Sequence, residues 1–197
     1  MNVHVALLHY PVYNRERQVI VSAITNLDIH DIARAALTYG VRRFFIVTPL
    51  EDQRQLVQRL LTHWRDGHGA RCHPERKAAL RLVTLTASLN EAVASIKDLC
   101  GRPPELMATG ASLAGLTLSY SQARERIGRG DPLLLLFGTG WGLSEEVLGM
   151  ADYLLAPVYG FADYNHLSVR SAVAIILDRL LGRRDDRQHS SRGDGGQ

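Results

Sequence analysis

The chain has 197 residues, of which 46% are hydrophobic and 22% charged, and its 23 basic and 20 acidic side chains leave a net charge of +3. This composition is typical of a globular protein with enough chain to bury a core, and it excludes collagen-like, coiled-coil and wholly disordered chains. No apolar run reaches the ~18 residues of a membrane span, and the N-terminus lacks a basic region followed by an apolar stretch, so we expect a cytoplasmic protein with no membrane partner.

Short apolar runs alternate with helical patterns along the chain. The expected elements are strands at residues 3–9, 43–48, 82–86, 106–109 and 132–137, and helices at residues 28–39, 50–64, 89–99, 120–127, from Ser144 onward and within 163–181. Gly40 is expected to end the first helix, and residues 67–76 to form a long connection.

The apolar run from Leu133 to Phe137 shows no polar alternation. Such a run indicates burial on both faces, as at the centre of a parallel sheet. The sequence therefore predicts an α/β fold, a mostly parallel sheet with helices on both faces. We expect one domain over residues 1–182 and a disordered polar tail over 183–197, which lacks large apolar residues.

The loop FGTGWGL, residues 137–143, follows the most apolar predicted strand. Its three glycines let the backbone approach a ligand closely, at the carboxyl end of a strand where open parallel sheets bind ligands. The loop lacks the lysine and hydroxyl residue of a phosphate-binding loop and the glycine spacing of a dinucleotide fold. Backbone hydrogen bonds to a nucleoside such as adenosine are therefore favoured, with a tight structural turn as the alternative.

The segment at residues 163–181 predicts a helix with a broad apolar face. Asn165 or Ser168 is the expected N-cap of this helix. The small side chains of Ser168 and its neighbours allow a ligand or another backbone to pack closely. His166 is either a capping or hydrogen-bonding histidine or, since it lies beside the expected ligand loop, part of the site.

The segment at residues 25–40 places charged side chains at the start of a helix. Asp28 and Asp31 lie in its first turn, where carboxylates favour the helix dipole and the free amides, and for Asp31 we favour this capping role. His30 and Arg34 are four residues apart and share a face. Such a face can bind phosphate or help to deprotonate a nucleophile.

The remaining composition is compatible with an RNA partner and with the absence of a metal site. Lys77 and Lys97 are the only lysines, so 21 of the 23 basic residues are arginines. Arginine forks onto phosphates and stacks on bases, although a genomic preference for arginine codons explains the composition equally well. Cys72 and Cys100 lie far apart in no metal-binding pattern, which predicts reduced thiols.

Taken together, the three segments resemble the motifs of the SPOUT superfamily of S-adenosylmethionine-dependent RNA methyltransferases. More narrowly, TNLDIHDIAR, FGTGWGL and DYNHLSVRSAVAIILDRL are similar to a small bacterial family within it, as are the HW-x-x-G-x-G element and the HP-x-R that follows at residues 63–76. The resemblance covers about residues 3–182. It implies a C-terminal trefoil knot, which the periodicity alone does not indicate because protein connections almost never knot.

The resemblance also implies an S-adenosylmethionine site. The glycine-rich loop is similar to the superfamily's second motif, and residues 156–160 and 164–169 are similar to its third, whose chain passes through the knot. The residues expected to bind the cofactor are Thr109, Gly110, Phe137, Gly138, Thr139, Gly140, Trp141, Gly142, Leu143, Ala156, Pro157, Val158, Tyr164, Asn165, His166, Leu167, Ser168 and Val169.

The first segment is similar to the motif that carries an arginine near the methyl acceptor in the 2′-O-ribose branch, and Arg34 falls at that place. The sequence departs from that branch at Asp28, where Asn is usual, and at His30, where Gly is usual. A ribose hydroxyl and a base nitrogen of tRNA or rRNA both stay open as acceptors. The implied catalytic group is Arg34, His30 and Asp28; because the pKa of an arginine lies above ~12, Asp28 or His30 could accept the proton.

The superfamily also implies a homodimer, which would join two arginine-rich surfaces into an RNA track. Two other functions are compatible with the sequence. The chain could be a silent S-adenosylmethionine-binding module that serves a separate methyltransferase or acts as a sensor. It could instead be a nucleotide-binding hydrolase that uses the glycine-rich loop, although no carboxylate pair at convincing spacing would hold a metal.

Overall fold

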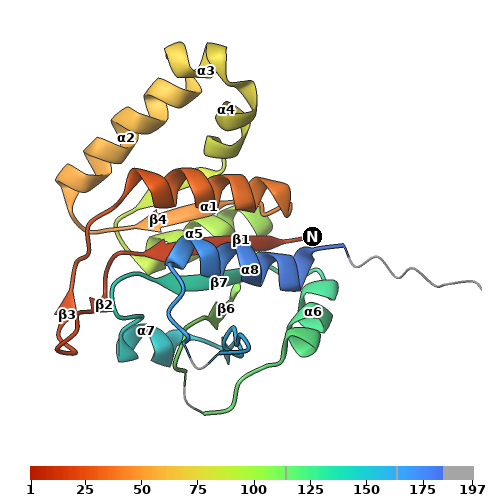
Figure 1. The fold of residues 1–197 in the computed structure, drawn as a ribbon. Coiled ribbons are helices and arrows are strands. Elements are labelled where there is room, and N and C mark those ends of the chain that lie inside the picture. Colours follow the sequence, from red (N-terminus) through yellow and green to blue (C-terminus); the bar gives the residue numbers. More distant parts are fainter. Residues whose placement is uncertain (114, 163, 184–197) are drawn as a thin grey trace, which may run out of the picture.

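The computed structural model describes residues 1–113, 115–162 and 164–183. Within them one parallel sheet of six strands has the order β5-β4-β1-β7-β6-β8 (Figure 1). Its strands are β1 (Val3–Leu8), β4 (Phe44–Val47), β5 (Val83–Thr86), β6 (Glu105–Ala108), β7 (Leu133–Gly138) and β8 (Tyr153–Leu154). A small antiparallel hairpin pairs β2 (Val12–Tyr13) with β3 (Val19–Ile20). The predicted parallel sheet is confirmed, whereas the predicted tail lies outside the described residues except for Arg183.

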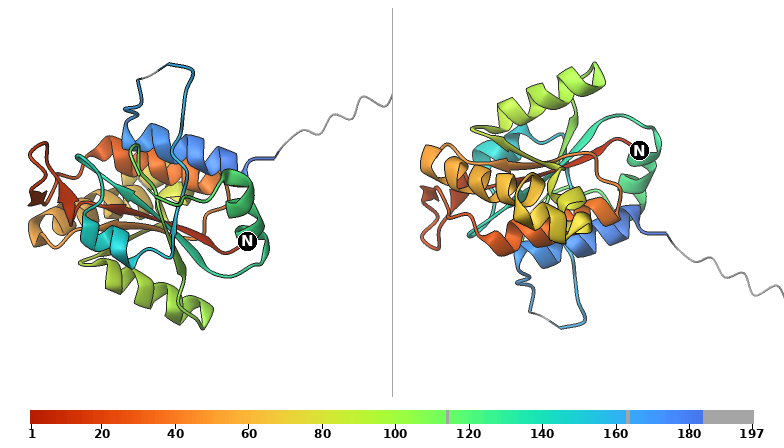
Figure 2. Two further views of the ribbon diagram at one scale, coloured as in Figure 1. Left: turned by 90° about the horizontal axis from the view of Figure 1, so that it is seen from below. Right: turned by 90° about the horizontal axis from the view of Figure 1, so that it is seen from above.

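Helices cover both faces of the sheet, as predicted (Figure 2). They are α1 (Asn26–Thr38), α2 (Glu51–Arg65), α3 (His68–Cys72), α4 (Pro74–Leu80), α5 (Leu89–Cys100), α6 (Tyr120–Gly128), α7 (Glu145–Met150) and α8 (Val169–Leu181). Side chains of α1, α2, α4, α6 and α8 form the hydrophobic core on one face. Those of α5 and α7 form the core on the other.

The centre of the sheet is apolar and fully enclosed. All six residues of β1 and the run from Leu133 to Phe137 in β7 are buried, and the two strands pair over their whole length, with Val5 opposite Leu135. This is the double burial that the unbroken apolar run predicts. His4 is the polar exception within β1, since its side chain is buried beside the ring of Phe45.

Two long helices begin and end at residues whose chemistry explains the boundary. The hydroxyl of Thr25 accepts a hydrogen bond from the Asp28 amide and caps α1, which ends before Gly40, where φ is +71°. Ser168 caps α8 by accepting from the Ser171 amide, so of the two residues considered for this role Ser168 has it.

The structure corrects the sequence prediction at the connection over residues 67–76. This segment forms α3 and the start of α4, and Pro74 occupies the first turn of α4, where a missing amide hydrogen is tolerated. Two glycines and a proline in ten residues have low helix propensity, but packing on neighbouring side chains overrides it. The short strands β2, β3 and β8 were also not predicted, because two residues carry no readable period.

Candidate functional site at the carboxyl edge of the sheet

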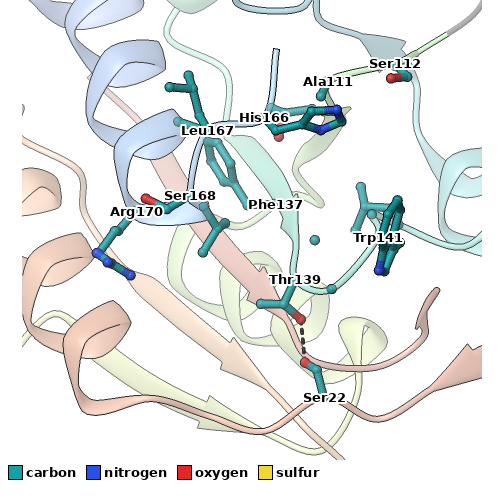
Figure 3. Close-up of a pocket in the computed structure, with 18 of the residues that line it drawn as sticks. Ser22, Ala111, Ser112, Phe137, Thr139, Trp141, His166, Leu167, Ser168 and Arg170 are labelled. Carbon is teal, nitrogen blue, oxygen red and sulfur yellow. Dashed lines mark hydrogen bonds between the residues drawn. The ribbon is translucent and has the colours of Figure 1, made fainter. Parts of the chain in front are cut away.

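A cavity of about 900 Å³ opens where β6 and β7 end. Because all strands of this sheet are parallel, their carboxyl ends meet at one edge, which is the usual ligand site of open α/β folds. Its walls come from the loops after β6 and β7, the segment before α8 and the first turns of α1 and α8. Figure 3 shows Phe137, Trp141, His166 and Ser168 arranged around the same open space. The volume lies in the range of small-molecule sites.

The glycine-rich loop is held by the β2–β3 hairpin. The Tyr13 amide donates to the Gly142 carbonyl (3.0 Å), and the Trp141 amide donates to the Tyr13 carbonyl (2.8 Å). Gly140 has φ of +58°, and a Cβ there would lie 2.7 Å from the Tyr13 carbonyl oxygen. The loop therefore needs glycine at this position to meet the hairpin. The sequence does not reveal this partner, because each strand of the hairpin has only two residues.

A chain of hydroxyl groups connects the loop to β1. The Thr139 hydroxyl donates to the Leu8 carbonyl (3.0 Å), so the Ser22 hydroxyl, 2.5 Å away, must donate to Thr139 (Figure 3). Nδ1 of His9 must then donate to Ser22, at 3.0 Å. This leaves the buried Nε2 of His9 as an acceptor with no partner in the described chain. Burial lowers the pKa of His9 to about 4, against the opposing effect of Asp28, so the ring is neutral at pH 7.

The segment before α8 closes another side of the cavity. The side-chain amide of Asn165 donates to the Ala111 carbonyl (3.0 Å), which holds the loop after β6 against this segment. The ring of His166 lies edge-on to that of Tyr164 at 5.4 Å, and both side chains are exposed. The N-cap of α8 is Ser168.

Most residues expected to contact a cofactor line this cavity. They are Thr109, Gly110, Phe137, Gly138, Thr139, Gly140, Trp141, Gly142, Leu143, Val158, Asn165, His166, Leu167, Ser168 and Val169. Three expected residues lie outside the lining. The Ala156 amide bonds the Leu118 carbonyl, Pro157 is buried, and Tyr164 is exposed.

Asp28 is the member of the expected catalytic group that lines the cavity. Its carboxylate is buried, accepts from the Thr25 hydroxyl (2.6 Å) and faces Arg170 at 3.4 Å. The guanidinium of Arg170 also lies 3.7 Å from the exposed Asp31. Asp31 therefore pairs with a neighbouring helix, and Arg170 is a site residue that the sequence pattern did not single out, since its partners lie 142 and 139 positions away.

His30 and Arg34 do share a helical face, but that face is turned away from the cavity. The His30 ring lies edge-on to Trp64 of α2 at 5.3 Å. Burial, and after it the positive charge of Arg76, lowers the pKa of His30. Arg34 lines a second and smaller pocket of about 300 Å³ together with His73 and Arg76 of the α3–α4 region. The expected catalytic group is therefore divided between two faces of α1.

Residues 1–113, 115–162 and 164–183 contain neither a metal-binding group nor a membrane-spanning helix. In this part of the chain no group of three or more His, Cys, Asp or Glu side chains is arranged to hold a metal ion. No helix within it combines the length and the hydropathy needed to cross a membrane.

The fold is that of the SPOUT methyltransferases. A methylase family protein from Neisseria gonorrhoeae is 19% identical with a TM-score of 0.63, over 93% of this chain and 83% of that chain. The SpoU methyltransferase AviRb from Streptomyces viridochromogenes, solved in complex with the cofactor AdoMet (S-adenosylmethionine), is 18% identical with a TM-score of 0.56, over 91% of this chain and 57% of that chain. At such identities the likeness concerns the fold alone.

The chain itself belongs to the SAM-dependent RNA methyltransferase family, whose sequence model matches residues 2–182. A tRNA (guanine-N(1)-)-methyltransferase of Oleidesulfovibrio alaskensis is 47% identical over 181 residues, which are 92% of this chain and 42% of that relative. An uncharacterized protein of Aquifex aeolicus is 42% identical over 183 residues, 92% of this chain and 89% of that relative. The chain thus spans about two fifths of the length of the first relative.

Proposed function

We propose that this protein binds S-adenosylmethionine in the cavity at the carboxyl edge of the sheet and transfers its methyl group to RNA. Family membership supports the reaction class, and the name of the Oleidesulfovibrio alaskensis relative supports tRNA as the substrate. The observation that carries the proposal is the cavity of about 900 Å³, whose lining matches the residues expected from the second and third SPOUT motifs. Its proposed place of action is the cytoplasm.

The residues of the cavity fit such a cofactor. A Cβ on Gly138 would lie 2.7 Å from the Leu143 amide nitrogen, so the loop folds back tightly on itself and needs glycine at this position. Phe137, Leu167 and Ile176 give apolar surface, and Asn165 and Ser168 add polar groups. This mixture of apolar walls with a few polar groups suits a nucleoside carrying an amino-acid chain.

The cofactor supplies a methyl group on a positive sulfonium, so the transfer is an in-line displacement that mainly needs positioning. Asp28 is the proposed proton acceptor, because it lines the cavity and each of its carboxylate oxygens has a lone pair to spare beside its one partner. Arg170 holds this carboxylate in place. Arg34 and His30, on the adjoining face of α1, are proposed to orient the RNA.

We further propose a trefoil knot, formed where the chain after β8 passes the loop after β6. Three contacts support this path. The Leu118 amide donates to the Leu154 carbonyl (2.7 Å), and the Ala156 amide donates back to Leu118 (2.9 Å). Beyond them Asn165 reaches Ala111 at the other end of the same loop.

A homodimer is proposed as the active form. Several large apolar side chains are exposed on the loops around the cavity, which favours burial against a second copy. These side chains are Leu116, Trp141, Tyr159, Phe161, Tyr164 and Leu167.

Calorimetric titration with S-adenosylmethionine tests the cofactor site. The wild type should bind, and Trp141→Ala should weaken binding roughly tenfold because it removes an exposed aromatic wall. Gly140→Val should weaken it further by forcing the loop from the hairpin. Leu56→Ala, which truncates an exposed side chain on α2, is the matched control. Equal affinity in all four proteins would contradict the assignment.

Transfer itself is tested by incubating the protein with labelled S-adenosylmethionine and RNA from a strain that lacks the gene. Incorporation into tRNA supports the enzyme, and mass spectrometry of the labelled nucleoside identifies the acceptor atom. Binding of the cofactor without any incorporation would instead favour the silent binding module.

A further inference from the structure

The HW-x-x-G-x-G element and the HP-x-R after it are not used by the cavity, yet they build a compact cluster against α1. Trp64 lies at its centre. The rings of His30 and His63 lie edge-on to Trp64, each at 5.3 Å, and the ring of His73 is tilted against it at 6.0 Å. Figure 1 shows α2, α3 and α4 together beyond α1, at one end of the molecule.

The glycines of the element are needed for this packing. A Cβ on Gly69 would lie 2.7 Å from the Trp64 ring and 3.0 Å from Nε2 of His63. One on Gly67 would lie 2.8 Å from the His63 carbonyl oxygen. The backbone of α3 therefore packs directly against the indole ring and restricts the movement of the Trp64 side chain.

The Trp64 ring forms a cation–π contact with Arg76. The guanidinium carbon of Arg76 lies 4.6 Å from the centre of the Trp64 ring, a distance at which the ring face attracts positive charge. Arg76 also lines the pocket of about 300 Å³ between α1 and α4, together with Arg34, Thr38 and His73. The motif thus orients one arginine toward a second that α1 presents.

Among the described residues, no ion pair neutralises these two positive charges. Within the described residues neither Arg34 nor Arg76 lies within ion-pair distance of a carboxylate, since Asp31, on the same helix as Arg34, pairs with Arg170. Glu75 is the one carboxylate in the lining, and it is exposed. Burial is the main cause that lowers the pKa of His30; the charges of Arg76 and Arg34 lower it further, and Asp31 opposes them.

The surrounding segment is basic as well. Residues 51–81 carry seven Arg or Lys and four Asp or Glu side chains, so this segment alone has an excess of three positive charges, equal to that of the whole chain. A pocket that joins Arg76 of this segment to Arg34 of α1, neither of them in an ion pair with another described residue, favours an anionic ligand.

We propose that the pocket between α1 and α4 binds a backbone phosphate of the RNA, with Arg76 and Arg34 as the two ligands. Planar guanidinium groups form paired hydrogen bonds with phosphate oxygens, and a pocket of this size admits a phosphate with its ribose. Arg34 follows Asp28 by six residues, about 9 Å along the helix axis, so the bound phosphate lies within a few nucleotides of the cavity. This inference rests on the proposed function, since it assumes an RNA substrate.

The test is the binding of unfractionated bacterial tRNA, measured by fluorescence anisotropy over a series of salt concentrations. Arg76→Gln and Arg34→Gln should each weaken binding about five- to tenfold and lower the salt slope by about one, the contribution of one phosphate contact. The affinity for S-adenosylmethionine should stay that of the wild type. Arg129→Gln, an exposed arginine at the end of α6, is the matched control and should change neither quantity by more than the error.

Unchanged tRNA affinity and salt slope in both pocket variants would overturn the proposal. A wild type that does not bind tRNA would overturn it too, together with the tRNA substrate on which it rests. Melting curves of each variant separate lost binding from lost folding, and Arg76→Lys, which keeps the charge, should restore part of the salt slope. If the wild type fails to bind S-adenosylmethionine but these differences persist, the proposed cofactor site fails and the phosphate site stands.

Discussion

Asp28 has a structural contact at the start of α1 and a proposed catalytic role in the cavity, and one substitution can test the second. Its carboxylate accepts from Thr25 at the start of α1 and also lines the cavity. Asp28→Asn keeps the size of the side chain but removes the proposed proton acceptor, so the rate of methyl transfer should fall about 100-fold or more while the affinity for S-adenosylmethionine stays unchanged. Transfer of labelled methyl groups to tRNA measures the rate.

The control for this substitution is Asp31→Asn, which disturbs the same arginine from outside the cavity. Asp31 lies 3.7 Å from Arg170 and is exposed, so its loss should change the rate by less than about threefold, as expected for a surface ion pair. A full rate in Asp28→Asn would exclude this carboxylate as the base.

Two buried histidines give the protein a predictable pH dependence. Burial is the main cause that lowers the pKa of both His4 and His9 to about 4, from the ordinary value of 6.5. Between pH 6.5 and 4 the unfolded chain binds these protons and the folded chain does not, so the free energy of unfolding falls as the pH falls through this window. It should drop by on the order of 2 kcal/mol per histidine between pH 6.5 and 5.

His4→Leu isolates the contribution of one histidine. Neither ring nitrogen of His4 has a hydrogen-bond partner among the described residues, so an apolar side chain of similar size should stabilise the fold by about 1–2 kcal/mol at pH 7. The variant should also lose about half of the pH dependence. Urea denaturation at pH 7 and pH 5 measures both effects, and a destabilised variant at pH 7 would mean that a hidden partner satisfies His4.

At the level of the elements, the sequence predicts the helices and strands that have a hydrophobic repeat and misses the short ones that have none. Each predicted strand and helix outside residues 67–76 is present, because alternation and helical spacing are properties of one segment alone. The β2–β3 hairpin that holds the glycine-rich loop has only two residues per strand. Helix α3 packs Gly69 against Trp64, and local helix propensity does not predict such a tertiary contact.

Gly69→Ala measures how much that contact contributes. Its Cβ would meet the Trp64 ring at 2.7 Å, so the variant should lose about 1–3 kcal/mol of stability and some tRNA affinity, while its cofactor affinity is unchanged. Gly128→Ala makes the same substitution in α6 where a Cβ meets nothing within 4 Å, and there about half a kcal/mol of stabilisation is expected. Chemical denaturation of the two variants gives the comparison. If Gly69→Ala were as stable as Gly128→Ala, α3 would tolerate displacement from the Trp64 ring.

At the scale of the whole molecule, the cavity could be predicted, whereas the division of the expected catalytic group between two faces of α1 could not. The glycine-rich loop follows a central strand, and parallel topology alone brings such a loop to the carboxyl edge. Which side chains of α1 face the cavity depends instead on the helices that pack against α1. Arg170 of α8 reaches Asp28, whereas α4 lies beside Arg34, and neither neighbour is readable from residues 25–40.

The exposed apolar loops lead to the last prediction, which concerns assembly. Phe161 is fully exposed and Tyr159 is 68% exposed, on the chain between Val158 and His166 that line the cavity. If a second copy covers this surface, Phe161→Glu places a charge in an apolar interface and should shift the protein from dimer to monomer. Sedimentation across a range of protein concentrations measures the shift. Val19→Glu, a half-exposed position on the β2–β3 hairpin, is the control and should leave the dimer intact. A wild type that sediments as a monomer at every concentration would remove the dimer from the proposed mechanism. A monomeric Phe161→Glu variant that still binds S-adenosylmethionine but no longer methylates RNA would show that the second copy completes the site.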